Sequence, residues 1–293
     1  MARDEKGHGS AIQVPGNLLT DLRRNPLGIA RRTPAFTWQL PRAIRFQTAY
    51  QVQVVSAPGD FTEHDHLIWD SGKVISSRTA HVRYSGPPLK PATCYRWRVR
   101  VWDEQDRPTA FSDPGSFVTG LWDGWRARWI WADAPLQENQ HVFFRRQVAL
   151  AGKPVRRVLA FVSADDYYKL YVNGRFAGQG PTPGYPEREY HYNTVDLTPY
   201  AAAGGSLTIA AHAYYQGLKN YVWVSGDGRR GFILELHIHY EDGTRQIVTT
   251  DESWRALVVP GYVGRHVIGM QTAFNEDIDA RLIPTEWQAP EFA

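Results

Sequence analysis

The chain has 293 residues, which is enough for two domains of ordinary size, each with a core of its own. Its 33 basic and 30 acidic residues leave a formal net charge of +3, and the arginines are spread along the chain in pairs, which argues against a nucleic-acid-binding surface. The polar start and the lack of an apolar run of about 18 residues predict a soluble, cytoplasmic protein that does not contact a membrane.

The composition points to an all-β protein. Aromatic residues make up 13% of the chain, alongside 25 Gly and 19 Pro, and no longer segment keeps the 3.6-residue apolar period of a helix. Cys94 is the only cysteine, which excludes an intrachain disulfide and a thiolate metal cluster. We interpret Cys94 as a small packing residue, because it lies in a strand pattern.

The first domain is predicted to follow a disordered lead-in at residues 1–14. Residues 15–120 contain short strand patterns separated by turn residues at the spacing typical of a sandwich. The patterns cover residues 17–40, 48–56, 67–75, 80–86, 92–108 and 115–121.

The segment Leu89–Trp102 carries the strongest signal of this domain. Over Tyr95–Trp102 apolar residues alternate with three arginines, which predicts a strand with one buried face and one solvent-facing face. Leu89–Tyr95 reads L-x-P-x-T-x-Y, which resembles the signature of fibronectin type III sandwiches. In such a tyrosine corner the phenol of Tyr95 bonds back to nearby backbone. We therefore predict a fibronectin type III-like sandwich over residues 15–120.

A tryptophan-rich connector, LWDGWRARWIWAD, is predicted at residues 121–133. We interpret its tryptophans as a hydrophobic seam between the two domains, and an aromatic platform for a ligand as the alternative. The four residues are Trp122, Trp125, Trp129 and Trp131.

Residues 134–293 are predicted to form a jelly-roll (galactose-binding-like) β-sandwich. Its strand patterns begin near Val142, and hairpin turns are predicted at Asn173-Gly174 and at residues 241–244. The tail from Met270 is acidic and broken by proline, which leaves open that this sandwich is truncated at its C-terminal end.

A carbohydrate-binding rim is predicted within Ser163–Asn193, with residues 213–231 as a second contact surface. An apolar strand runs into Asp165-Asp166, and a loop rich in proline and glycine then carries several tyrosines. Aromatic faces stack on sugar rings, while carboxylates and amides pair with hydroxyls. The alternative is that the tyrosines are half-buried strand residues. The predicted binding residues are Asp165, Asp166, Tyr185, Tyr190, Tyr192, Asn193, Tyr215, Gln216, Asn220 and Trp223.

Two groups of residues have the side-chain types of metal ligands. Asp165 and Asp166 are candidate Ca²⁺ ligands, because Ca²⁺ takes hard oxygen donors; the alternative is that they cap a strand end through bonds to backbone. Glu235, His237 and His239 share one strand face and resemble a zinc set, but simple alternation predicts a solvent-facing polar side there, so we expect no zinc.

No catalytic residue is predicted. Inverting glycosidases hold two carboxyl groups roughly 6.5–9.5 Å apart. The pairs Glu187/Glu189 and Asp277/Asp279 each share a face of an extended chain, whereas Asp165 and Asp166 point apart. Surface charge on loops is the favoured interpretation of these acids.

Several motifs resemble, in this order, the N-terminal half of bacterial alpha-L-rhamnosidases. They are NPLGIARRTPAFTWQL, WDSGKV, YSGPPLKPATCYRWRVRVWD, ADDYYKLYVNG, TDESW and NEDIDAR. The resemblance implies a fibronectin-like domain and a jelly-roll domain, followed in the family by a further β-domain and a catalytic (α/α)6 barrel. It also implies that Asp165-Asp166 stand where some members bind calcium and rhamnose.

The sequence thus predicts a non-catalytic N-terminal portion of an alpha-L-rhamnosidase-like glycoside hydrolase. We expect it to bind the terminal L-rhamnose of a glycan or glycoside, or to support the catalytic barrel, which this chain lacks. No cofactor is required, and Ca²⁺ is an optional ligand. A protein-interaction scaffold and a free-standing carbohydrate-binding protein are the alternatives, and whether the chain is itself an enzyme stays open.

Overall fold

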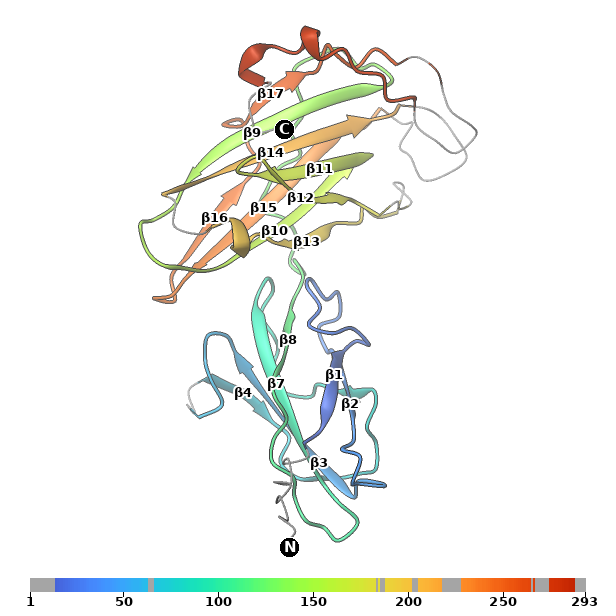
Figure 1. Ribbon diagram of the computed structural model, residues 1–293, viewed down its shortest axis with the longest axis vertical. Helices are drawn as coiled ribbons and strands as arrows, with labels where there is room; N and C mark the ends of the chain where they lie inside the picture. Colours follow the sequence, from blue (N-terminus) through green and yellow to red (C-terminus); the bar gives the residue numbers. More distant parts are fainter. Residues whose placement is uncertain are drawn as a thin grey trace, which may run out of the picture. The chain divides into compact units, whose positions relative to one another are not determined.

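The computed structural model describes residues 14–62, 66–182, 184, 188–201, 205–217, 228–264, 266 and 274–287. The chain forms two compact units, residues 1–123 and 124–293 (Figure 1), so the division falls within the range predicted as a tryptophan-rich connector. Throughout the described ranges the regular elements are β-strands and single 3₁₀ turns, which confirms the predicted all-β class.

The first unit is a fibronectin type III-like sandwich of two sheets. One sheet has the strand order β1-β2-β6, and the other has the order β4-β3-β7-β8, with β5 also paired to β3. The strands are β1 Gly16–Thr20, β2 Ala35–Gln39, β3 Ala49–Ser56, β4 Leu67–Asp70, β5 Val74–Ile75, β6 Val82–Arg83, β7 Cys94–Trp102 and β8 Gly115–Val118.

The central strand β7 has the predicted alternation. Its apolar residues are buried and its arginines are half-exposed, because successive side chains of a strand point to opposite faces. The ring of Trp97 packs 4.4 Å from that of Phe36, and its Nε1 donates a 3.0 Å hydrogen bond to Thr20 Oγ1 on β1. The core therefore joins the two sheets through aromatic packing and one satisfied buried polar group.

The predicted tyrosine corner is confirmed. The Tyr95 hydroxyl accepts a 2.8 Å hydrogen bond from the Lys90 backbone N–H, and Tyr95 is buried. Tyr95→Phe is expected to lower the free energy of unfolding of this unit by about 1–2 kcal/mol, because the Lys90 N–H loses its acceptor in a place with little water. Urea denaturation followed by tryptophan fluorescence measures the change.

Tyr50→Phe is the matched control for this substitution. Tyr50 is a half-buried tyrosine on β3 that packs against Trp38, with ring centroids 5.3 Å apart. Its hydroxyl makes no hydrogen bond with the described part of the chain, so its removal is expected to change stability by less than about 0.5 kcal/mol. Equal losses in the two variants would contradict the role given to Tyr95.

The second unit is a jelly-roll sandwich whose two sheets face each other in Figure 1. Their strand orders are β12-β11-β14-β9-β17 and β13-β10-β15-β16. The elements are β9 Gln140–Ala149, β10 Val155–Asp165, β11 Tyr167–Val172, β12 Arg175–Gly180, β13 Asn193–Asp196, η2 Thr198–Tyr200, β14 Ser206–Tyr215, β15 Gly231–Tyr240, β16 Arg245–Thr249, β17 Arg255–Val258, η3 Ala280–Leu282 and η4 Thr285–Trp287.

Both hairpin predictions are confirmed. Asn173 and Gly174 join β11 to β12 and have φ of 50° and 73°, the left-handed values that a type I′ turn requires. The turn between β15 and β16 closes through a 3.0 Å bond from the Tyr240 N–H to the Thr244 carbonyl, with Gly243 at φ 81°.

The strand β10 is buried on both faces. Its inward residues, such as Val158 and Val162, belong to the core between the sheets, and Phe161 on the opposite face is fully buried as well. Glu235 and His237 lie on this second face of the sheet and are only 1% and 3% exposed. The prediction that they face solvent is therefore wrong.

The physical reason is a covering segment at the start of the unit. The backbone N–H of Arg126 donates a 2.7 Å hydrogen bond to Glu235 Oε2, so residues near 126 lie against the outer face of β15. The period-two pattern of β15 places its polar residues on one face of the sheet, but it does not predict that another segment packs on that face.

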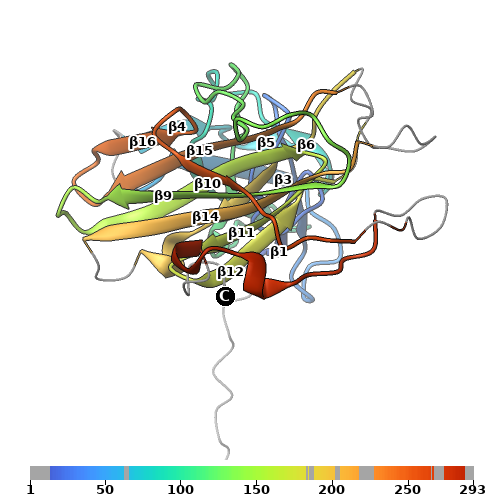
Figure 2. The ribbon, with the colours of Figure 1, turned by 90° about the horizontal axis from the view of Figure 1, so that it is seen from above.

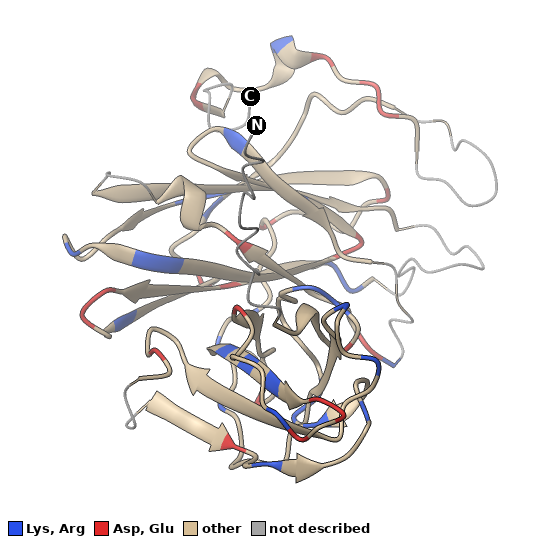
Figure 3. Ribbon diagram, turned by 60° about the horizontal axis from the view of Figure 1, so that its bottom comes forward, with Lys and Arg blue, Asp and Glu red and all other residues tan. Residues whose placement is uncertain are grey.

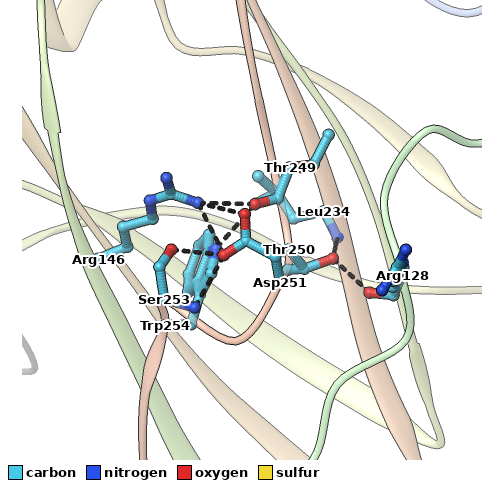
Figure 4. Close-up of polar contacts among 8 residues, drawn as sticks. All are labelled: Arg128, Arg146, Leu234, Thr249, Thr250, Asp251, Ser253 and Trp254. Atoms are coloured by element: carbon cyan, nitrogen blue, oxygen red, sulfur yellow. Dashed lines mark hydrogen bonds and ion pairs between the residues drawn. The ribbon is translucent and has the colours of Figure 1, made fainter.

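The motif TDESW, residues 250–254, is a structural turn between β16 and β17 (Figure 4). The Thr250 Oγ1 donates to the Arg128 carbonyl at 2.6 Å and accepts from the Leu234 N–H at 3.2 Å. Asp251 accepts from the Ser253 N–H and contacts the Arg146 guanidinium of β9 at 3.3 Å. These contacts join both sheets of the sandwich at one end.

The C-terminal segment packs on the outer face of the five-stranded sheet, where Figure 2 shows it crossing the strands. Val259, Ile283 and Trp287 form a small apolar cluster with Phe143 of β9. One side of this sheet thus faces the core, and the other is partly covered by Val259, Ile283 and Trp287.

Basic and acidic residues are interspersed along the ribbon (Figure 3), as the small net charge suggests. No helix within the described ranges is long and apolar enough to cross a membrane.

Candidate functional site

The predicted rim begins with two buried carboxylates at the end of β10. Asp165 and Asp166 are 3% and 8% exposed. The Asp166 backbone N–H donates to the Tyr214 carbonyl at 2.8 Å, and its Oδ2 accepts a 2.6 Å hydrogen bond from the Gln216 N–H. Asp166 therefore binds backbone, as the capping alternative proposed, and it also fixes the chain that follows β14.

Tyr190 completes this group from the loop before β13. Its hydroxyl donates to Asp165 Oδ2 at 3.3 Å. Its ring lies 5.3 Å from the ring of Trp129 and 5.7 Å from the guanidinium carbon of Arg229. We call Asp165, Asp166, Tyr190, Asn193 and Gln216 the acidic rim.

The Trp129 ring depends on a glycine in β15. Gly231 pairs with Asp165 across the sheet, and a Cβ at Gly231 would lie 2.6 Å from the Trp129 ring. Only glycine allows this approach without a shift of the aromatic ring. The backbone bridge between Ile130 and Phe232 holds the tryptophan segment beside β15.

Asn193 lies at the start of β13, where its Oδ1 accepts a 2.8 Å hydrogen bond from the Tyr168 hydroxyl. A Cβ at Gly180 would lie 2.0 Å from that same oxygen, so the end of β12 must be glycine for the amide to reach Tyr168. The amide is thereby held at the edge of both sheets, with Tyr168 serving as its buried support.

The other predicted binding residues differ in burial, and three of them lie outside the described residues. Tyr192 is half-buried and packs against Trp125 and Phe161, with ring centroids 5.4 and 6.1 Å apart. Tyr215 is 2% exposed at the end of β14. Tyr185, Asn220 and Trp223 lie outside the described residues.

Three residues of this region were missed by sequence reasoning: Trp129, Arg229 and Tyr168. Trp129 was assigned to a seam between domains, since its position beside Tyr190 depends on a backbone bridge to β15 that has no sequence signal. Tyr168 lies within the predicted stretch, but its inward orientation follows only from the pairing of β11 with β14.

The candidate metal ligands are distributed as follows. Glu235 Oε1 lies 2.7 Å from His237 Nε2, a buried hydrogen-bonded pair. Within the described ranges no three His, Cys, Asp or Glu side chains come together in a metal-binding arrangement. Asp165 and Asp166 offer two hard oxygen donors of the kind that Ca²⁺ prefers, and backbone and amide oxygens around them have the same chemistry.

Asp165 and Asp166 are buried, but the other described candidates for catalytic acids are exposed or partly exposed. Glu189 is exposed and its Oε1 is 3.4 Å from His191 Nε2. The Asp279 side chain accepts a hydrogen bond from the Arg281 backbone N–H at the start of η3, and it also forms an ion pair with the Arg281 guanidinium. Asp277 is exposed, and Glu187 lies outside the described residues.

Each of the two domains matches a model of a known protein family. Residues 15–123 match the model of the Rha78A-like, N-terminal immunoglobulin domain, and residues 153–293 match the alpha-L-rhamnosidase N-terminal domain. These two domain types follow each other in the chain in this order. The chain belongs to the alpha-L-rhamnosidase family, as its motifs predicted.

Curated relatives extend well beyond this chain. An alpha-L-rhamnosidase of Streptomyces avermitilis is 31% identical over 84% of this chain and 25% of its own length. One from Formosa agariphila is 26% identical over 94% of this chain and 32% of its own length. The chain therefore spans about a quarter to a third of these relatives.

Solved structures confirm the fold. The alpha-L-rhamnosidase from Dictyoglumus thermophilum has a TM-score of 0.75 and 26% identity, over 94% of this chain and 32% of that one. The enzyme from Aspergillus terreus has a TM-score of 0.70 at 21% identity, over 85% of this chain and 30% of that one, which supports the fold alone.

Proposed function

We propose that this chain is the non-catalytic N-terminal portion of an alpha-L-rhamnosidase and that its acidic rim binds a terminal L-rhamnose of a glycan. The observation that carries the proposal is the pair of buried carboxylates, Asp165 and Asp166, beside the Tyr190 phenol. Burying carboxylates costs free energy that a purely structural strand end does not require.

The chemistry of the acidic rim suits a deoxysugar. Carboxylate oxygens accept hydrogen bonds from sugar hydroxyls, and the side-chain amides of Asn193 and Gln216 offer both donors and acceptors. The phenol ring and the nearby Trp129 ring offer apolar surface for C–H groups and for a methyl substituent. L-rhamnose presents both kinds of surface, hydroxyls and a C6 methyl.

Calcium is proposed as a ligand of the same carboxylates. Ca²⁺ takes six to eight oxygens, of which Asp165 and Asp166 would supply the charged ones. The remaining donors would be backbone and amide oxygens and hydroxyls of the sugar. Bound Ca²⁺ would neutralise the buried negative charge and polarise the hydroxyls that it contacts.

Rhamnose binding is expected to depend on Asp165. In isothermal titration with L-rhamnose, Asp165→Ala is expected to weaken affinity by about tenfold or more, because a charge-assisted hydrogen bond contributes about 1.5–3 kcal/mol. Asp277→Ala, which removes an exposed carboxylate elsewhere on the same unit, is the matched control and is expected to bind as the wild type does.

The outcome separates the rival functions. A domain that only supports a catalytic (α/α)6 barrel, or a scaffold whose acidic rim contacts protein, is expected to give no heat with rhamnose at millimolar concentration. Equal affinity for L-rhamnose in Asp165→Ala and the wild type would show that the sugar does not bind at the acidic rim.

Calcium is expected to stabilise the second unit. At a free Ca²⁺ concentration 100 times the dissociation constant, the free energy of unfolding should rise by about 2.7 kcal/mol, and EDTA should abolish the gain. Asp166→Asn keeps the size of the side chain and is expected to lose most of this effect. A melting temperature that is identical in Ca²⁺ and EDTA would contradict calcium binding.

A further inference from the structure

A polar hollow lies on the second unit where β14, β9 and β17 run side by side. Its volume is about 570 Å³, which falls within the range of small-molecule sites. Its described lining consists of Arg145, Arg146, Gln147, Thr208, Ser253 and Arg255. Three of these residues carry a positive charge, and no Asp or Glu is among them. The hollow therefore has the composition of an anion-binding site.

This hollow lies away from the acidic rim. No residue of the rim belongs to its described lining. Thr208 and Tyr214 are both in β14, and at about 3.3 Å per residue the strand separates them by roughly 20 Å. The rim residue Gln216 follows the end of that strand and is further away along the chain. A small ligand in the hollow therefore makes no contact with the rim.

The pairing of β17 with β9 brings two arginines of the hollow together. Arg255 lies directly opposite Arg145, and the Cβ atoms of such a cross-strand pair are roughly 5 Å apart. The guanidinium carbons of Arg145 and Arg255 lie 5.1 and 5.3 Å from the ring centroid of Trp287, so one aromatic ring orders both side chains. Like charges directly opposite each other destabilise a sheet. An anion that contacts both guanidiniums would offset their repulsion.

The third arginine already has an acidic partner. The Arg146 Nη1 contacts the Asp251 carboxylate at 3.3 Å and donates to the Thr249 carbonyl at 2.9 Å (Figure 4). Arg255, in contrast, is exposed and forms no ion pair with the described part of the chain. Its guanidinium is therefore the group of the hollow that is most available to a ligand.

We propose that this hollow binds a phosphate group, either as the free ion or as the monoester of a small molecule. At pH 7 a phosphate monoester carries a charge of about −1.5 to −2 and three acceptor oxygens. One guanidinium pairs with two oxygens, which uses up a carboxylate, whereas phosphate keeps a third oxygen for the second guanidinium of the Arg145 and Arg255 pair. The Thr208 hydroxyl and the Gln147 amide add neutral donors.

Isothermal titration of the full 293-residue chain tests the proposal. The probes are inorganic phosphate, glucose 1-phosphate and sodium glucuronate, in a chloride buffer at constant ionic strength. We expect saturable heats with both phosphates, at dissociation constants of about 1 mM or below, and weaker binding of glucuronate. Tighter binding of glucose 1-phosphate would identify a monoester as the ligand, and equal or tighter binding of inorganic phosphate would identify the free ion.

Arg255→Gln is expected to weaken phosphate binding by about 10-fold or more, because charge-assisted hydrogen bonds are lost. Arg175→Gln is the matched control, since Arg175 is also an exposed strand arginine over an aromatic ring, 5.4 Å from the centroid of Tyr200, but lies outside the hollow. It should leave the affinity unchanged. Arg255→Lys keeps the charge without the planar fork, and its affinity is expected to lie between those of the wild type and Arg255→Gln.

The absence of saturable heat with both phosphates would overturn the proposal, as would tighter binding of glucuronate than of either phosphate. Equal affinity for phosphate in Arg255→Gln and Arg175→Gln would overturn it too, because the ion would then not bind at the hollow. Rhamnose binding at the acidic rim is tested by Asp165 variants, so failure at the hollow leaves that function standing.

Discussion

Acidification from pH 7 to pH 5 is expected to lower the free energy of unfolding of residues 124–293 by about 4 kcal/mol, through His141 and His212. Burial, first of all, lowers the pKa of His141 to about 2, with repulsion from His212 and Lys169 adding to it. Burial and Lys169 lower the pKa of His212 to about 3. Both lie well below the ordinary histidine value of 6.5.

The sign follows from proton uptake. Between the folded pKa and 6.5 the unfolded chain binds a proton at each ring and the folded chain does not, so acid favours unfolding. Stability is therefore full above about pH 7 and declines as the pH falls through 6.5. At pH 5 each histidine lowers the free energy of unfolding by about 2 kcal/mol, since each pH unit below the unfolded pKa lowers it by about 1.4 kcal/mol.

Hydrogen exchange read by mass spectrometry on the full chain measures this loss. Peptides from β9 and β14 should lose protection between pH 7 and pH 5, after correction for the intrinsic exchange rate. Peptides from β3 and β7 of the first unit serve as the internal reference. His212→Gln removes one titrating ring and is expected to halve the slope; an unchanged slope in that variant would contradict the assignment.

This histidine pair also shows where sequence reasoning ends. Period-two alternation and turn motifs predicted the strand β7, the Asn173-Gly174 turn and the Tyr95 corner, because each depends on residues close in sequence. The contact between His141 and His212 joins residues 71 positions apart and requires the pairing of two strands. No local pattern reports that pairing.

The acidic rim follows the same logic. Asp165 and Asp166 were found because a strand of apolar residues ends at them, which is a local signal. The Trp129 ring beside Tyr190 was not found, since it depends on Gly231 and on a bridge between segments about 100 residues apart. Sequence thus located the acids but not the aromatic group that packs around them.

Glu235→Ala is expected to lower the free energy of unfolding of the second unit by about 2–6 kcal/mol, because it leaves two buried hydrogen-bonding groups unsatisfied at roughly 1–3 kcal/mol each. Glu235 is 1% exposed, and its carboxylate accepts from the Arg126 N–H at 2.7 Å and lies 2.7 Å from His237 Nε2. Alanine would leave both groups buried without their acceptor.

Two substitutions calibrate this effect in urea denaturation. Glu235→Gln keeps an acceptor oxygen and is expected to lose about half as much. Glu252→Ala removes an exposed carboxylate in the turn before β17 and is expected to change stability by less than about 0.5 kcal/mol. A loss of under about 1 kcal/mol in Glu235→Ala would show that the covering segment near Arg126 does not depend on this carboxylate.

The pH dependence of the two predictions separates them. Burial alone raises the pKa of Glu235, but hydrogen bonds from His237 and Arg126 outweigh it and hold the pKa below its ordinary value of 4.5. Its contribution is therefore present above 4.5 and is lost as the pH falls through the lower folded pKa. The histidines act from about pH 6.5 down to their folded pKa values of about 2 and about 3. Glu235→Gln should therefore reduce only the loss of stability below pH 4.5, whereas His212→Gln should reduce the slope on both sides of pH 4.5.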